Sequence, residues 1–297
     1  MVSKIDDFLT FLTVEKGYSR NTIEAYRNDL LQFSKFLQEQ GIDGWGEVTK
    51  EHLIAFILDM KKREYSSSTV ARKVAATKAF LHFLVSENVI GDDPSANLDS
   101  PAVTKRLPRP ISPDEIEALL TAPDAERDSR GIRDKALLEL LYATGMRVTE
   151  VVSLEVDDVN LASATVRCLG KASKERIIPI YPKAVEALET YLERGRVPLL
   201  KDAQEKALFV NHRGERLTRQ GLWLIIKRYV KQVGLNELVT PHTLRHSFAT
   251  HMLNGGADLR NVQKLLGHAN ISTTQIYTQV STKHMRHVYD ESHPRAK

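Results

Sequence analysis

Residues 241–253, PHTLRHSFATHML, and residues 258–278, DLRNVQKLLGHANISTTQIYT, decide the fold of the larger part of this chain. The first stretch contains His242 and Arg245, whose spacing of three residues puts both side chains on one face of a helix. The second carries the tetrapeptide LLGH and, nine residues after its histidine, a tyrosine. An HxxR pair alone is a weak motif. Its combination with LLGH and the tyrosine is typical of a site that acts on a phosphate group.

The chemistry of such a site depends on cations placed around a weak nucleophile. Tyr277 has a phenol whose ordinary pKa of about 10 leaves it poorly reactive unless it loses its proton as it attacks. His268 ends LLGH, Arg147 lies in ATGMRVTE and Lys171 lies in the turn GKASKER. Arginine stays protonated and matches two phosphate oxygens, and donors placed where charge develops are usually the largest catalytic contribution. With the HxxR pair, these residues predict a metal-free site for breaking and rejoining DNA.

The same motifs identify a family resemblance. The segments GMRVTEV, GKASKERIIPI, PHTLRHSFATHML, DLRNVQKLLGHANISTTQIYT and the terminal HPRAK resemble the tyrosine recombinase (lambda-integrase-like) family, in its Xer subgroup. The resemblance covers nearly the whole chain and is strongest after about residue 109. It implies a mainly α fold with a small β-sheet: a helical, SAM-like domain that binds the core DNA site, followed by an α-rich catalytic domain.

The resemblance also implies a role for each site residue. Tyr277 is the nucleophile, and Lys171 is the general acid that protonates the departing 5′ oxygen. His242 assists proton removal, and His268 donates a hydrogen bond to a non-bridging oxygen, while the two arginines clamp the phosphate. The choice of Lys171 over Lys174 rests on the GK resemblance alone.

A metal site is the alternative interpretation of the histidines. His242 and His246 are four residues apart and His251 follows, but no glutamate lies between them as in HExxH, and carboxylates at ligand spacing are missing. The dipeptide Gly170-Lys171 lacks the spacing of a P-loop. We therefore expect neither a metal nor a cofactor.

Composition bounds the class of protein. The 297 residues favour two domains, and no apolar run reaches the roughly 18 residues of a membrane span. The acidic residues of MVSKIDDFL are unlike a signal peptide, so a cytoplasmic protein is expected.

The lone cysteine, Cys168, fits a reducing compartment and is expected to be a packed strand residue. The net charge is +4, and residues 1–107 contain 14 basic and 15 acidic residues, so the positive excess lies in the second part.

Residues 1–100 are expected to form a small four-helix domain. Asn21, followed by Glu24, predicts a helix start, and apolar residues every three or four positions define the buried face of that second helix. A third helix is expected over 50–62 and a fourth over 68–88. Residues 101–110, which are rich in proline, are expected to form an extended linker.

Basic residues in and after this domain are candidates for phosphate contact. A solvated basic face without a partner is the alternative. The helices near Arg72 and Arg219 are candidates for reading bases. The candidate DNA contacts are Lys61, Lys62, Arg63, Arg72, Lys73, Lys105, Arg106 and Arg219.

Residues 111–297 are expected to form the catalytic domain. Ser112, Pro113 and Glu115 reproduce a capping box with proline at the first helical position, and Gly145 ends an apolar helix. The segments ATVRCL and ERIIPI predict a hairpin about GKASK, and ALFV predicts a further strand. Later helices are expected over 183–194, 219–233, 243–253 and 259–266.

The resemblance implies partners as well. They are a double-stranded DNA recombination site held between the two domains, and a second copy or a paralogous recombinase, in a tetramer on two synapsed sites. The tail over about 283–297 would pack into a neighbouring subunit, and a septal DNA translocase is a candidate activator. The implied function is resolution of chromosome or plasmid dimers through a 3′-phosphotyrosyl intermediate and a Holliday junction. A phage, transposon or integron integrase, a type IB topoisomerase and a catalytically silent DNA-binding protein remain alternatives.

Overall fold

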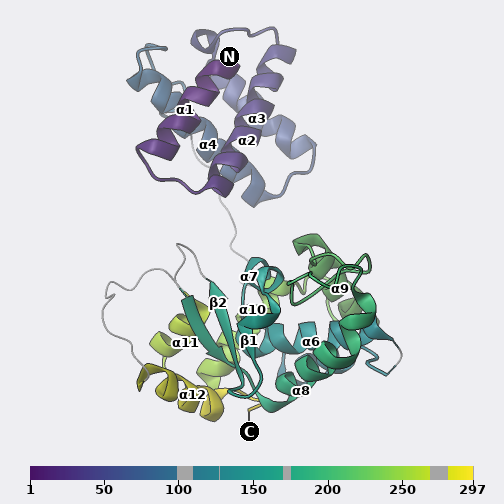
Figure 1. Ribbon diagram of the computed structural model, residues 1–297. Coiled ribbons are helices and arrows are strands. Elements are labelled where there is room, and N and C mark those ends of the chain that lie inside the picture. Colours follow the sequence, from purple (N-terminus) through teal and green to yellow (C-terminus); the bar gives the residue numbers. More distant parts are fainter. Residues whose placement is uncertain (99–109, 127, 170–174, 268–279, 297) are drawn as a thin grey trace. The chain divides into compact units, whose positions relative to one another are not determined.

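The structure, a computed structural model, describes residues 1–98, 110–126, 128–169, 175–267 and 280–296. The chain divides into two compact units, Met1–Arg106 and Leu107–Lys297. Each unit has its own hydrophobic core. Figure 1 shows the helical first unit and a second unit that combines helices with a small sheet.

Among the described residues, helices alone build the first unit. They are α1 (Val2–Val14), α2 (Arg20–Glu39), a 3₁₀ turn (Trp45–Glu47), α3 (Lys50–Lys62) and α4 (Ser67–Ser86). The expected four-helix domain is therefore confirmed, and α3 has the predicted bounds.

Aromatic side chains fill the core of the first unit. Phe80 of α4 packs edge-on against Phe8 of α1, with ring centroids 5.4 Å apart, and against Trp45 at 4.7 Å. Such edge-to-face pairs add to the free energy gained by burying the rings. The predicted cap of α2 is wrong by two residues: the side chain of Ser19, not that of Asn21, accepts a hydrogen bond from the backbone N–H of Thr22 at 3.3 Å.

The second unit is also mainly helical. Its α-helices among the described residues are α5 (Pro113–Thr121), α6 (Ser129–Thr144), α7 (Val148–Ser153), α8 (Pro182–Thr190), α9 (Arg219–Gln232), α10 (Pro241–Asn254), α11 (Leu259–Leu266) and α12 (Val280–Ser292). Short turns lie over Val156–Asp158, Tyr191–Gly195 and Val197–Leu199. The capping box that precedes α5 is confirmed: Ser112 and Glu115 exchange hydrogen bonds of 2.7 and 3.2 Å.

A three-stranded antiparallel sheet, in the order β1–β2–β3, lies beside these helices. Its strands are β1 (Val159–Asn160), β2 (Thr165–Leu169) and β3 (Glu175–Pro179), and Val166 pairs with Ile178. The pairing of the two predicted strands is confirmed. In β2, Val166 and Cys168 face the core while Arg167 and Leu169 are exposed. The strand predicted for ALFV is wrong. Residues 207 and 210 make only isolated bridges, to Glu155 and Arg216.

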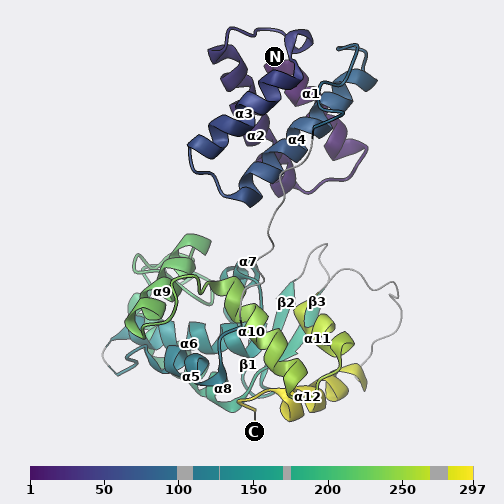
Figure 2. The ribbon, with the colours of Figure 1, turned by 180° about the vertical axis from the view of Figure 1, so that it is seen from behind.

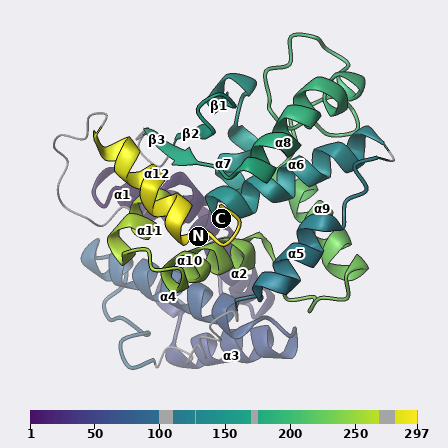
Figure 3. The ribbon, with the colours of Figure 1, turned by 90° about the horizontal axis from the view of Figure 1, so that it is seen from below.

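Helix α6 forms the centre of the second unit. Nearly all of its side chains are buried, and it packs against α8 on one side and α10 on the other (Figure 2). Figure 3 shows α12 lying beside α10, where Tyr289 of α12 is completely buried. This helix was not predicted. The residue at the end of α6, Gly145, leads directly into the segment that carries Arg147.

Candidate phosphate-binding groove

Arg147 lies at the first turn of α7, just after the tight exit from α6. Gly145 ends α6 in the left-handed region with φ +57°, a conformation that glycine adopts at little cost. The backbone N–H of Arg147 donates to Oε2 of Glu150 at 2.7 Å, and its Nη1 donates to Oε1 at 3.1 Å. The Arg147 side chain is still 45% exposed. Its guanidinium is thus oriented by Glu150 and open to a ligand.

Arg245 lies on α10 and is nearly buried, at 8% exposure. Its Nη1 donates to the carbonyl oxygen of Gly145 at 2.6 Å and its Nη2 to that of Leu266 at 2.7 Å. Burial, with the charge of Arg147 nearby, lowers the pKa of Arg245 to about 10. The guanidinium therefore remains charged at neutral pH.

A groove of about 620 Å³ brings these two arginines together with residues of α9 and α10. His242 and Arg245 both line it, as expected from their shared helical face, and His242 is exposed. Arg219 and Trp223 of α9 line the same groove. The lining residues are Met146, Arg147, Val148, Thr149, Arg219, Gln220, Trp223, Pro241, His242 and Arg245. A groove with fixed cations and an exposed imidazole suits an anionic phosphodiester.

Glu150 and Arg176 do not line the groove but hold Arg147, which does. Glu150 accepts hydrogen bonds from Nη1 and Nη2 of Arg176 at 3.1 and 2.8 Å. Burial alone would raise the pKa of Glu150, but hydrogen bonds from Arg176 and from the backbone of Arg147 hold it below its ordinary value. The carboxylate is thus ionised and shared between two arginines.

Three of the six predicted catalytic residues are described, and the groove unites them: Arg147, His242 and Arg245. The other three, Lys171, His268 and Tyr277, lie outside the described residues, as do the linker candidates Lys105 and Arg106. Trp223 is a groove residue that the sequence analysis missed. Its position on the same helix as Arg219, one turn later, was the available signal.

His251 and Cys168 belong to the interior of the second unit. Nδ1 of His251 lies 2.8 Å from the hydroxyl of the buried Tyr142, whereas His242 is exposed. Within the described ranges, no group of three or more potential ligands among His, Cys, Asp and Glu could hold a metal ion. Cys168 is buried in β2, and burial raises the pKa of its thiol to about 11, so its assignment as a packed strand residue is confirmed.

The basic residues of the first unit differ in how accessible they are to a phosphate group. Lys61 and Lys62 are exposed at the end of α3, and Arg63 pairs with Asp59 at 2.9 Å. Arg72 is 43% exposed and pairs with Asp29.

Lys73 is a correction to the expected phosphate contacts. Its side chain is 3% exposed, and its ammonium group donates to Asp29 at 2.8 Å and to Gln32 at 2.7 Å. A buried ammonium needs such partners, so Lys73 belongs to the interior of its domain.

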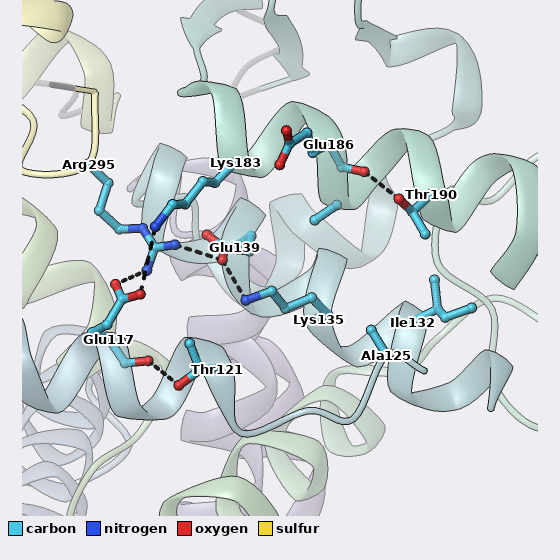
Figure 4. A pocket seen from close by; sticks show the side chains of 11 residues that line it. Glu117, Thr121, Ala125, Ile132, Lys135, Glu139, Lys183, Glu186, Thr190 and Arg295 are labelled. Atoms are coloured by element: carbon cyan, nitrogen blue, oxygen red, sulfur yellow. Dashed lines mark hydrogen bonds and ion pairs between the residues drawn. The ribbon is translucent and has the colours of Figure 1, made fainter. Parts of the chain in front are cut away.

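The end of the chain packs on its own second unit. The ring of His293 is completely buried and stacks on that of Tyr289, with centroids 4.9 Å apart. Figure 4 shows Arg295 directed toward Glu117 of α5 and Glu139 of α6, and it donates to Glu139 at 3.0 Å. Glu117, Glu139 and Arg295 line a pocket of about 350 Å³ between α5, α6 and α8.

None of the described helices is both long and apolar enough to cross a membrane.

Comparison with known proteins accounts for both units. The model of the phage integrase family matches residues 109–284, and that of the phage integrase N-terminal SAM-like domain matches residues 5–88. Together they cover most of the two units and all of the groove.

Relatives of high identity extend over nearly the full length. Tyrosine recombinase XerC of Herpetosiphon aurantiacus is 53% identical over 281 residues, which are 95% of this chain and 92% of the relative. Tyrosine recombinase XerD of Halalkalibacterium halodurans is 46% identical over 295 residues, 99% of this chain and 98% of the relative. The chain belongs to the phage integrase family, in the Xer subgroup of tyrosine recombinases. It is a site-specific DNA recombinase.

Solved structures agree with the fold. XerA recombinase matches with a TM-score of 0.50 and 29% identity over 95% of this chain and 96% of that chain. XerH bound to a palindromic difH substrate, in a post-cleavage complex, matches with a TM-score of 0.69 and 24% identity over 90% of this chain and 79% of that chain.

Proposed function

We propose that this chain cleaves and rejoins DNA at a specific site through a phosphotyrosyl bond to Tyr277, and so resolves dimers of chromosomes or plasmids at cell division. The observation that carries the proposal is the groove that Arg147, His242 and Arg245 share. Two fixed guanidinium groups can bind two non-bridging oxygens of one phosphodiester. The names XerC and XerD of the relatives support the cellular role.

The chemical step exchanges one phosphate ester bond for another, so the energy of the DNA phosphodiester is kept in the phosphotyrosyl bond. The Tyr277 oxygen attacks phosphorus while His242 assists removal of its proton, and the bond from phosphorus to the 5′ oxygen breaks. Lys171 gives a proton to that oxygen, which leaves as a 5′ hydroxyl. Charge that gathers on the non-bridging oxygens is stabilised by the two arginines and His268. Attack by a 5′ hydroxyl of the partner strand reverses the step, makes a Holliday junction and requires no ATP.

Both units contact the duplex in this proposal. Lys61, Lys62 and Arg72 of the first unit, with Arg63, bind phosphates, and Lys105 and Arg106 follow the backbone. Arg219 lies on the groove at the first turn of α9 and is a candidate for reading bases. Solved relatives support DNA contact, since a lambda integrase dimer was crystallised on a core site and XerH on difH.

A tetramer of this chain, alone or with a paralogous recombinase, would act on two synapsed sites in the cytoplasm. In the structure the tail packs on its own second unit. We propose that in the tetramer the tail from about residue 283 docks instead on a neighbouring subunit and couples the two, and that a septal DNA translocase activates the complex. Deleting residues 285–297 should reduce synapsis, and unchanged recombination would contradict the role of the tail. Because Tyr289 and His293 are buried, thermal unfolding must be followed for the same variant.

The deciding experiment uses a nicked suicide duplex that carries a chromosome-dimer-resolution site, incubated with the protein in EDTA. A covalent complex on a denaturing gel is expected from the unaltered chain and not from Tyr277→Phe. An adduct that persists in the variant would mean that another residue is the nucleophile. Relaxation of supercoiled plasmid without paired sites would favour a topoisomerase. Binding without any adduct would favour a partner-dependent or silent protein.

A further inference from the structure

Arg176 connects parts of the second unit that are far apart in sequence. It lies on β3, two residues after the segment 170–174 that contains Lys171. Its side chain is 13% exposed, and its two terminal nitrogens donate to the two oxygens of Glu150 at 3.1 and 2.8 Å. This is the paired geometry in which a guanidinium binds a carboxylate most firmly. β3 is thereby fixed to α7.

The same carboxylate orients Arg147. Glu150 is 7% exposed and accepts from the backbone and from Nη1 of Arg147, at 2.7 and 3.1 Å. Oε1 receives one donor from each arginine, and so does Oε2. Since a buried carboxylate is stable only while its partners stay in place, displacing Arg176 alters the support of Arg147.

On its other side, Arg176 holds the end of α11. Its Nε donates to the carbonyl oxygen of Leu265 at 2.9 Å, and Arg245 holds the next carbonyl, that of Leu266, at 2.7 Å. Gly267 follows with φ +67°, and a Cβ there would lie 2.9 Å from Nη1 of Arg176. The backbone that leads to His268 is therefore fitted closely around this guanidinium.

We infer that Arg176 is a positioning residue of the recombination reaction, one that holds Arg147, the end of α11 beside His268 and the strand after Lys171 in a fixed relation. The inference rests on the proposed function. Arg176 does not line the groove, so it acts through Glu150 and Leu265 and not by touching DNA. Lysine cannot replace it, because one ammonium group cannot reproduce the planar fork and the Nε contact together.

The test compares Arg176→Lys with Arg167→Lys. Arg167 lies in the same sheet, is 51% exposed and pairs with Asp158 at 2.9 Å, with no contact to the groove. Single-turnover formation of the covalent complex on the suicide duplex, with protein in excess, gives the rate of the bound and folded fraction. For Arg176→Lys we expect this rate to fall at least about 30-fold, with the Kd for intact duplex changed less than about threefold. Arg167→Lys should match the unaltered chain.

A second pair of variants separates positioning from folding. Gly267→Ala retains Arg176 but crowds its Nη1, and should slow covalent-complex formation in the same direction. The double variant Arg176→Lys/Glu150→Gln should be little slower than Glu150→Gln alone, because both changes break the same pair between Arg176 and Glu150.

The outcomes are distinct. An unaltered rate in Arg176→Lys and Gly267→Ala, or fully multiplicative losses in the double variant, would overturn the inference and leave the proposed function standing. A merely structural Arg176 would lower the melting temperature without slowing the bound fraction, which would also overturn it. No adduct from the unaltered chain would overturn the proposed function and this inference with it.

Discussion

Arg245 donates a 2.6 Å hydrogen bond to the carbonyl oxygen of Gly145, the residue that turns the chain out of α6 toward Arg147. One guanidinium thus fixes the turn that positions the other. The turn is tight, because a Cβ on Gly145 would lie 2.4 Å from the ring of Phe248. The two arginines of the groove therefore depend on one backbone conformation.

Gly145→Ala should be strongly destabilising and should slow DNA cleavage. A left-handed alanine costs about 1 kcal/mol and overpacking against Phe248 adds about 1–3 kcal/mol, so we expect a loss of about 2–4 kcal/mol. Urea unfolding measures it. Gly234→Ala is the matched control, since Gly234 also has a positive φ, +68°, but nothing lies within 4 Å of its added Cβ. A loss for Gly145→Ala no larger than that of Gly234→Ala would contradict the crowding at the turn.

Most of the fold could be predicted because its signals are local. Helices α3 and α11 begin and end where expected, since their apolar periods and end residues agree. ALFV was misassigned as a strand because a short buried apolar run has the same composition in a strand and in a core-facing loop. Helix α12 was missed because most of its residues are polar, which conceals the face that buries Tyr289 in the hydrophobic core.

The site was predicted less evenly. Arg147, His242 and Arg245 could be found because their chemistry is tied to short motifs. Lys73 could not be judged from sequence, because its partner Asp29 lies 44 positions away. The supporting role of Arg176 was equally hidden, since the carbonyl of Leu265 is 89 positions away. Long-range partners decide whether a cation is structural or available to a ligand.

Arg147→Lys should separate charge from geometry in the groove. Lysine retains the positive charge but loses the planar fork that binds two phosphate oxygens. We expect covalent-complex formation to fall at least about 100-fold while the Kd for the intact site changes less than about threefold. Arg213→Lys, an exposed arginine that does not line the groove, should have no effect. Equal losses of binding and cleavage would instead assign Arg147 to general electrostatic attraction.

Acid should destabilise the catalytic unit through His293. Burial lowers the pKa of His293 to about 3, and it also lowers that of His251. Below the unfolded pKa of about 6.5, His293 binds a proton in the unfolded chain but not in the folded chain. The free energy of unfolding therefore falls as pH falls from about 6.5 toward 3. Between pH 7 and pH 5, His293 accounts for about 2 kcal/mol of that loss.

His293→Phe keeps the aromatic stacking and cannot bind a proton, so its stability should fall less between these two pH values. Urea unfolding followed by Trp223 fluorescence in a Trp45→Phe background reports the catalytic unit. His287→Gln is the control, because His287 is 68% exposed. An equally steep pH dependence in His293→Phe would remove His293 as the source of the acid sensitivity.

Replacing Lys62 and replacing Lys73 by alanine should have opposite effects on stability and on the salt dependence of DNA binding. Lys62 is exposed, so Lys62→Ala should leave stability within about 0.5 kcal/mol and lower the slope of log K against log salt by about 0.9 if it neutralises one phosphate. Lys73→Ala leaves Asp29 buried with fewer partners, at 1% exposure, and should cost roughly 3–5 kcal/mol. The salt slope of its folded fraction should stay unchanged, because its ammonium group is already engaged inside the domain. Urea unfolding and DNA titrations between 50 and 200 mM salt measure both quantities. A stable Lys73→Ala variant with a reduced salt slope would restore Lys73 as a phosphate contact and would mean that its pair with Asp29 opens when DNA binds.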